Sequence, residues 1–214
     1  KQNCSQILDC WNFISFISSN NIKGSIMKEG LIGILGAGKS GIACCELALE
    51  LGYKVILSDI SSDKKIDIDK NKNLSIEKGI HSKDLLRCDF IIISPGIPPE
   101  TEIVRKVEEN NIPIIGEIEF ASWFTNSDIL SITGSNGKST TCKIIEKILK
   151  AAKINVKTVG NIGYPILSLN KTKKKYVFIL EISSYQLQYS KLFRSKHAAI
   201  LNISPDHLER HKNI

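Results

Sequence analysis

Two short apolar runs in this sequence each lead directly into a glycine-rich loop, and a helical pattern follows each loop. Leu31–Leu35 precedes Gly36-Ala37-Gly38, and Ile129–Ile132 precedes Gly134-Ser135-Asn136-Gly137. A continuous apolar run is typical of a strand buried on both faces of a parallel sheet. The repeated order of strand, loop and helix therefore predicts an α/β fold built as two successive units.

Further apolar runs extend the same pattern along the 214 residues. The predicted strands are 31–35, 55–57, 90–93, 129–132, 176–180 and 198–201, and the predicted helices are 40–51, 99–110 and 138–151. Gly52 is expected to end the first helix, and Pro99 suits the first turn of the second. A polar break at 125–128 separates the two units. We predict a Rossmann-like domain over residues 27–120 and a second α/β domain over 121–214, with residues 1–26 left as an unassigned extension.

The first loop fits two different phosphate-binding patterns. Residues 33–40 match the Walker A string G-x-x-x-x-G-K-[ST], whereas Gly36, Gly38 and Gly41 match G-x-G-x-x-G. Gly33 lies inside the predicted strand, which favours a tight turn of the dinucleotide-binding type over a long P-loop. Asp59 ends the next strand, where such folds bind a ribose or a base. A glycine turn that serves only the packing of helix on sheet is the alternative without a ligand.

The second loop has the chemistry of a nucleoside triphosphate site. Small residues allow successive backbone N–H groups to converge on phosphate oxygens, and the following helix adds a positive partial charge at its N-terminus. Lys138 supplies a point charge, and the hydroxyl of Ser139 or Thr140 can bind Mg²⁺. The predicted ligand is ATP with Mg²⁺. The residues assigned to ATP are Gly134, Ser135, Asn136, Gly137, Lys138, Ser139 and Thr140.

Polar residues follow the next two strands of the second unit. Glu181 ends one strand and is followed by Ser183, while the segment from Asn202 to His207 follows the other. Open α/β sheets bind ligands at the carboxyl ends of their strands. Taken alone, Glu181 reads better as a solvent-exposed carboxylate at a strand end. The set together indicates a metal and ligand site, for which we predict Ser139, Glu181 and His207 as metal ligands.

Composition narrows the choice of partners. The net charge of +7 suits polyanionic ligands in general. The lysine-rich run 171–175 adjoins no aromatic or arginine-rich segment and is expected to be a solvated loop, so we predict no nucleic-acid partner. No run of eighteen apolar residues occurs, so we predict no membrane partner. The six cysteines form no metal-ligand or disulfide pattern and indicate a reducing, cytoplasmic setting.

Four motifs in order give the chain a family resemblance. They are Gly134-Ser135-Asn136-Gly137-Lys138-Ser139-Thr140, Gly160-Asn161-Ile162-Gly163, Glu181-Ile182-Ser183-Ser184-Tyr185-Gln186-Leu187 and Asp206-His207-Leu208-Glu209-Arg210. Together they resemble the Mur ligases, over about residues 31–210. The third motif and the Ser after the first glycine of the loop are typical of the branch that adds D-glutamate to UDP-N-acetylmuramoyl-L-alanine, since other branches usually carry Thr there. The resemblance implies an ATP-dependent amide ligase of peptidoglycan precursor synthesis.

The resemblance also implies residue roles. Lys138 and His207 would be catalytic, with Lys138 on the ATP phosphates and His207 beside a second Mg²⁺ and the muramoyl substrate. Asn161 and Ser183 would contact that substrate. The residues that would hold its UDP part are Lys39, Ser40, Asp59, Ser94, Pro95 and Gly96.

Two departures from the family pattern qualify these roles. The family more often has an apolar residue and Thr at the positions of Lys39 and Ser40. A direct contact of Lys39 with the pyrophosphate is therefore a hypothesis drawn from this sequence alone. The family's modified lysine and its D-glutamate-binding domain would lie beyond Ile214, so we expect a truncated second domain and a chain inactive alone. The alternatives are an NAD(P)-dependent oxidoreductase, suggested by the first loop and Asp59, a different Mur-type ligase, and a basic nucleic-acid binder.

Overall fold

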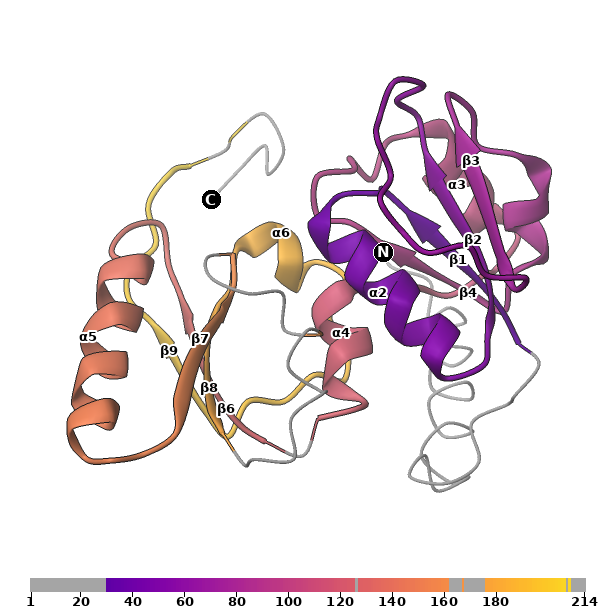
Figure 1. Ribbon diagram of the computed structural model, residues 1–214. Helices are drawn as coiled ribbons and strands as arrows, with labels where there is room; N and C mark the ends of the chain where they lie inside the picture. The colour runs from indigo at the N-terminus through magenta and orange to yellow at the C-terminus, as the bar shows by residue number, and fades with distance from the viewer. Residues whose placement is uncertain (1–29, 126, 162–166, 168–175, 207, 209–214) are drawn as a thin grey trace. The chain divides into compact units, whose positions relative to one another are not determined.

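The computed structural model forms two compact units, which divide between Ile115 and Gly116 (Figure 1). The structure describes residues 30–125, 127–161, 167, 176–206 and 208. The predicted extension 1–26, the lysine-rich run 171–175 and His207 lie outside the described residues.

The first unit is built on a five-stranded sheet of order β3-β2-β1-β4-β5. Its strands are β1 (Leu31–Leu35), β2 (Lys54–Asp59), β3 (Leu74–Lys78), β4 (Phe90–Ile93) and β5 (Ile114–Gly116). The pairings of β1 with β2 and β4, and of β2 with β3, are parallel. All four residues of β4 are buried, as a central strand covered on both faces requires.

The helices of the first unit are α2 (Lys39–Glu50) and α3 (Glu102–Glu109), with a 3₁₀ helix over Lys83–Arg87. The path from β1 through α2 to β2 moves across the sheet in one direction, and the path from β4 through α3 to β5 moves in the other. Right-handed crossovers therefore place α2 and α3 on opposite faces of the sheet (Figure 1). The strand order reverses between β1 and β4, and open sheets bind ligands beyond the carboxyl ends of the strands at such a point.

The second unit holds a four-stranded parallel sheet of order β7-β8-β6-β9. Its elements are α4 (Glu117–Ser122), β6 (Asp128–Thr133), α5 (Lys138–Ala151), β7 (Val156–Gly160), β8 (Val177–Glu181), α6 (Ser184–Leu187) and β9 (His197–Ile200). Helix α5 lies along one face of the sheet (Figure 1) and contributes Cys142, Ile145 and Leu149 to a core shared with Ile132 and Ile179. The strand order reverses between β6 and β9.

The predicted α/β class with two parallel sheets is confirmed, and the six predicted strands appear with end shifts of at most two residues. The prediction that the second helix begins at Pro99 is wrong, because that helix begins at Glu102 after an extended Thr101. Three strands were not predicted, namely β3, β5 and β7. They lie at sheet edges or are only three residues long, so their sequences carry few consecutive apolar residues.

The division after Ile115 falls five residues before the predicted boundary at 120/121. The difference arises because α4 is bonded into the second unit. The Gly116 N–H donates to the Tyr189 carbonyl at 2.9 Å, and one carboxylate oxygen of Glu119 accepts from the backbone N–H groups of 191, 192 and 193. In the described part of the chain, no helix is both long and apolar enough to cross a lipid bilayer.

Candidate functional site

The glycine turn after β1 is tight. Strand β1 ends at Leu35 and α2 begins at Lys39, which confirms the turn predicted from Gly33 lying within the strand. Gly36 has a φ of +95°, which favours glycine. A Cβ added at Gly41 would collide with the Gly36 carbonyl oxygen, so helix and turn approach as closely as this glycine permits.

A pocket of about 900 Å³ opens at this turn, where the strand order of the first sheet reverses. The predicted residues Ser40, Asp59, Ser94 and Gly96 all line it, whereas Lys39 is exposed and is not among the lining residues. The structure therefore gathers most of the predicted UDP-binding set around one cavity. It also adds three basic side chains that the sequence did not single out, Lys64, Lys83 and Lys106.

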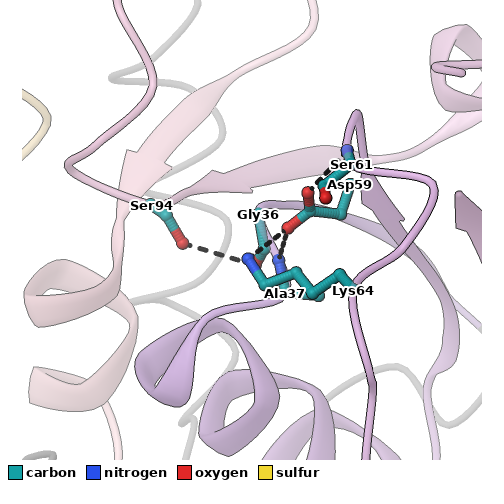
Figure 2. A network of polar contacts seen from close by, with 6 residues as sticks. All are labelled: Gly36, Ala37, Asp59, Ser61, Lys64 and Ser94. Atoms are coloured by element: carbon teal, nitrogen blue, oxygen red, sulfur yellow. Dashed lines mark hydrogen bonds and ion pairs between the residues drawn. The ribbon is translucent and has the colours of Figure 1, made fainter. Parts of the chain in front are cut away.

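Asp59 is bonded to the protein itself rather than pointing free into the pocket. Figure 2 shows its carboxylate between the glycine turn and Lys64: Oδ2 accepts from the Ala37 N–H at 2.7 Å and from the Lys64 ammonium at 2.6 Å, and Oδ1 accepts from the Ser61 N–H at 3.0 Å. Ser94 donates to the Gly36 carbonyl at 3.4 Å (Figure 2). These bonds fix the turn and leave Asp59 only part of its acceptor capacity for a ligand.

Burial disfavours the ionised form of Asp59 and by itself raises the pKa of that carboxyl. The hydrogen bond from Lys64, those from the Ser61 and Ala37 N–H groups, and the Lys64 charge outweigh burial, so the net pKa lies below the usual aspartate value. A depressed pKa means that the ionised carboxylate stabilises the folded unit.

We expect Asp59→Asn to lower the free energy of unfolding of the first unit by about 1–2 kcal/mol at pH 7, because the amide removes the charge paired with Lys64 and, with its oxygen toward Ala37 and Lys64, turns its NH₂ group toward the Ser61 N–H. The carboxylate's contribution is fully present above the unfolded aspartate pKa of about 3.9 and is lost as the pH falls through the lower folded pKa. Urea unfolding measured between about pH 2 and pH 7 should therefore show the two proteins converging in acid. A constant difference across that range would contradict this role.

A second group of polar side chains forms another wall of the same pocket. His81 Nδ1 lies 2.7 Å from the Ser58 hydroxyl, which donates to Glu77 at 2.8 Å, and Ser82 also donates to Glu77. Burial lowers the pKa of His81, against the opposing charges of Glu77 and Asp59. No sequence signal marked His81, because its partners are 4 and 23 residues away along the chain.

In the second unit, the phosphate-loop candidate joins β6 to α5. Gly137 caps the helix with a φ of +84°, and α5 begins at Lys138 as predicted. The Lys138 ammonium lies within the loop and donates to the carbonyls of Gly134 at 2.6 Å and Ser135 at 3.0 Å. Ser139 and Thr140 occupy the first turn of α5.

Glu181 lies at the carboxyl end of β8, as predicted, but it is not a solvent-exposed carboxylate. It is only 1% exposed; Oε1 accepts from the Asn161 amide at 3.2 Å, and Oε2 has no hydrogen-bond partner among the described residues. A buried carboxylate oxygen without a donor is costly unless a cation binds it. The arrangement therefore fits a divalent cation with oxygen ligands. Within the described ranges, no group of three or more His, Cys, Asp and Glu side chains is placed to hold a metal ion.

Ser183 is occupied by helix capping. Its hydroxyl accepts from the Gln186 N–H and donates to the Gln186 side chain, which in turn accepts from the Ser183 N–H at 3.0 Å. This is a capping box of the S-x-x-Q type, a signal that the sequence held and that our sequence analysis did not use. The Ser183 hydroxyl keeps one lone pair with which it could accept from a substrate donor, whereas donating to substrate would replace its bond to Gln186.

Two family models match the chain. "Mur ligase MurD-like, N-terminal domain" matches residues 31–116, and "Mur ligase middle domain" matches residues 132–214. The first range spans the five strands of the first sheet, and the second begins near the end of β6 and includes the phosphate loop, α5, β7, β8 and β9.

Curated proteins give the same result at the level of sequence. The chain is 38% identical over 198 residues to the UDP-N-acetylmuramoylalanine–D-glutamate ligase of Elusimicrobium minutum, covering 88% of this chain and 44% of that protein. It is 40% identical over 183 residues to the protein of the same name from Bacteroides thetaiotaomicron, covering 84% and 41%. The chain thus spans less than half the length of these relatives.

Among solved structures, the crystal structure of UDP-N-acetylmuramate:L-alanyl-gamma-D-glutamyl-meso-diaminopimelate ligase from Neisseria meningitides superposes with a TM-score of 0.50. The match covers 85% of this chain and 63% of that one, at 17% sequence identity. At this identity the likeness concerns the fold alone.

Proposed function

The chain belongs to the Mur ligase family, and from this we propose that it is part of an ATP-dependent ligase that joins D-glutamate to UDP-N-acetylmuramoyl-L-alanine. It has a MurD-like N-terminal domain and a Mur ligase middle domain, which is the ATP-binding domain of that family. The observation that carries the proposal is the pairing of the phosphate loop containing Lys138 with the buried carboxylate of Glu181 at the edge of one sheet. The named relatives at 38% and 40% identity support the choice of D-glutamate.

The first unit would bind the UDP part of the substrate. The pocket lies at the reversal of strand order, where the N-terminus of α2 presents backbone N–H groups suited to a pyrophosphate. The N–H groups of Gly36 and Ala37 are donated to Ser58 and Asp59 and shape the turn instead. Lys64 and Lys83 add positive charge around it. Backbone donors recognise any pyrophosphate, so a glycine turn of this type does not by itself require NAD(P). In this proposal it binds the pyrophosphate of UDP.

The proposed reaction makes an amide from a carboxylate, which is a poor electrophile with a poor leaving group. The substrate carboxylate would attack the γ-phosphorus of ATP, forming an acyl phosphate and releasing ADP. The amine of D-glutamate would then attack the acyl carbon, and phosphate would leave. Lys138 would hold the phosphate charge during the first step, and catalysis would rest on positioning and electrostatics.

Mg²⁺ would be held by Glu181 and by the hydroxyl of Ser139 or Thr140, with His207 proposed beside a second ion and the muramoyl substrate. When bound, the ion neutralises the charge on the phosphate oxygens and polarises the phosphorus. Asn161 donates to the other oxygen of Glu181 and would keep the free one directed to the metal.

We expect Glu181→Gln to weaken Mg²⁺-dependent ATP binding by about tenfold, because the amide removes the negative charge while keeping the size of the side chain. The measurement is calorimetric titration with ATP in the presence of Mg²⁺ and again with excess EDTA. The variant should differ from the unchanged chain only when Mg²⁺ is present. An equal loss under both conditions would indicate damage to the sheet edge instead of loss of a metal ligand.

The experiment that tests the proposed function is titration of the folded chain with Mg·ATP, with UDP-N-acetylmuramoyl-L-alanine and with NADH. We expect the first two to bind and NADH not to bind; the opposite result would revive the oxidoreductase alternative. In the protein that carries this chain, phosphate release should require D-glutamate. Turnover with another amino acid and none with D-glutamate would contradict the assignment.

The proposal places the reaction in the cytoplasm. Cys44, Cys45, Cys88 and Cys142 are all buried free thiols, which fits a reducing compartment. No nucleic acid or membrane partner enters the proposed reaction.

A further inference from the structure

We infer that Asn202 is a positioning residue for the phosphate loop, holding the loop in its binding shape before a nucleotide arrives; the inference rests on the proposed ATP-binding function of that loop. Asn202 follows β9, and the loop follows β6. These two strands are neighbours at the reversal of strand order in the second sheet.

The side chain of Asn202 forms hydrogen bonds with both the backbone N–H and the backbone carbonyl of the loop residue Asn136. Its Oδ1 accepts from the backbone N–H of Asn136 at 2.8 Å, and its Nδ2 donates to the Asn136 carbonyl at 2.9 Å. An asparagine amide is planar and carries a donor and an acceptor side by side, so it can fix the two peptide groups that flank Asn136 in the manner of a neighbouring strand. Neither a purely accepting nor a purely donating side chain of that size can make both bonds.

The backbone of residues 202–204 also forms hydrogen bonds with the preceding loop residue, Ser135. The Ser135 N–H donates to the Asn202 carbonyl at 3.1 Å. The Ser135 hydroxyl donates to the Ser204 carbonyl at 3.0 Å and accepts from the Ser204 N–H at 2.9 Å. Residues 202–204 thus brace the first half of the loop through all of these bonds, and we call them the bracing segment.

The bracing segment decides which loop groups can bind phosphate. The N–H groups of Ser135 and Asn136 are already donated to Asn202, so the donors left for a nucleotide are those at the start of α5 together with the Lys138 ammonium. The sequence assigned Ser135 and Asn136 to ATP on equal terms with Gly137 and Lys138. In the structure Ser135 and Asn136 hold the loop in shape, and Gly137 and Lys138 are left to bind phosphate. Preorganising a loop in this way lowers the entropy lost on binding.

The test uses Asn202→Ala and Asn202→Asp in the whole chain with two readouts. The first is hydrogen–deuterium exchange of the Ser135 and Asn136 amides without nucleotide, and the second is the calorimetric Kd for Mg·ATP. Both variants should bind Mg·ATP about tenfold more weakly, and Asn202→Ala should exchange at least about tenfold faster at Asn136. Asn202→Asp keeps the acceptor of the Asn136 N–H, so exchange there should rise less in that variant. Aspartate keeps the size and the acceptor but lacks the donor, so a role in filling space would be rescued by Asn202→Asp and a positioning role would not.

Ile203→Ala is the matched control, because Ile203 lies inside the bracing segment with a side chain that is 74% exposed. It should leave both readouts unchanged. The charge that Asn202→Asp adds is separated from the loss of geometry by repeating the titration in about 0.5 M salt, which screens exposed charges.

Unchanged exchange at Asn136 in Asn202→Ala would overturn the inference, and so would faster exchange with unchanged ATP affinity. If the unchanged chain fails to bind Mg·ATP, the proposed function fails and the nucleotide part of the inference fails with it. The exchange result still decides separately whether Asn202 orders the loop.

Discussion

Replacing Lys138 with alanine should weaken binding of Mg·ATP to the chain by about 100-fold. The ammonium is the only charged group placed inside the phosphate loop among the described residues, and it bonds the loop carbonyls of Gly134 and Ser135. In that position it can exchange carbonyl partners for phosphate oxygens, and charge-assisted bonds to phosphate are among the strongest in proteins. Lys138→Arg should not restore binding, because the larger planar guanidinium does not fit a site built for a point charge.

Lys143→Ala is the matched control for charge. Lys143 lies on the same helix α5, is exposed, and has no bond to the loop. Its removal should change the Kd for Mg·ATP by less than about twofold, as expected for a screened surface charge. If Lys138→Ala binds Mg·ATP within about threefold of the unchanged chain while keeping its thermal stability, the loop is not the triphosphate site.

The second large effect concerns stability rather than binding. Glu119→Ala should lower the free energy of unfolding of the second unit by about 4 kcal/mol. Glu119 is only 1% exposed. Its Oε2 accepts from the backbone N–H groups of Lys191, Leu192 and Phe193 at 2.8, 3.0 and 2.9 Å, and Oε1 accepts from the Trp123 indole at 3.0 Å. Alanine would remove the acceptor shared by these four donors and leave a cavity in its place.

Glu119→Gln separates the hydrogen bonds from the volume. The amide oxygen can face the three backbone donors, but the amide NH₂ then faces the Trp123 N–H, so a smaller loss of about 1–2 kcal/mol is expected. Urea unfolding followed by circular dichroism gives both values. Glu109→Ala, an exposed glutamate on α3, should stay within about 0.5 kcal/mol of the unchanged chain. Equal losses for Glu119→Ala and Glu109→Ala would show that the bonds to residues 191–193 carry no stability.

The candidate site could be predicted only in part from the sequence. The two glycine loops, Lys138 and the strand-end position of Glu181 were found because each depends on a few consecutive residues. The burial of Glu181 and its unbonded oxygen could not be predicted, since they depend on how β8 is covered. For the same reason the sequence did not show that Ser183 caps α6 or that Lys39 is absent from the pocket lining, and the assignment of both residues to substrate stays a prediction.

By itself the sequence determined the α/β class, the order of strand, loop and helix in each unit, and the residue types available at each strand end. These follow from apolar runs and from glycines in turns, which act over a few neighbouring residues. Only the tertiary structure decided which polar groups meet: Asp59 with Ala37 across 22 positions, Asn202 with Asn136 across 66, and Glu119 with the backbone of residues 191–193 across 72 to 74. A local pattern cannot encode such pairings. The first two arise because the sheet brings the carboxyl ends of distant strands to one edge, and the third because α4 is bonded to the segment that precedes β9.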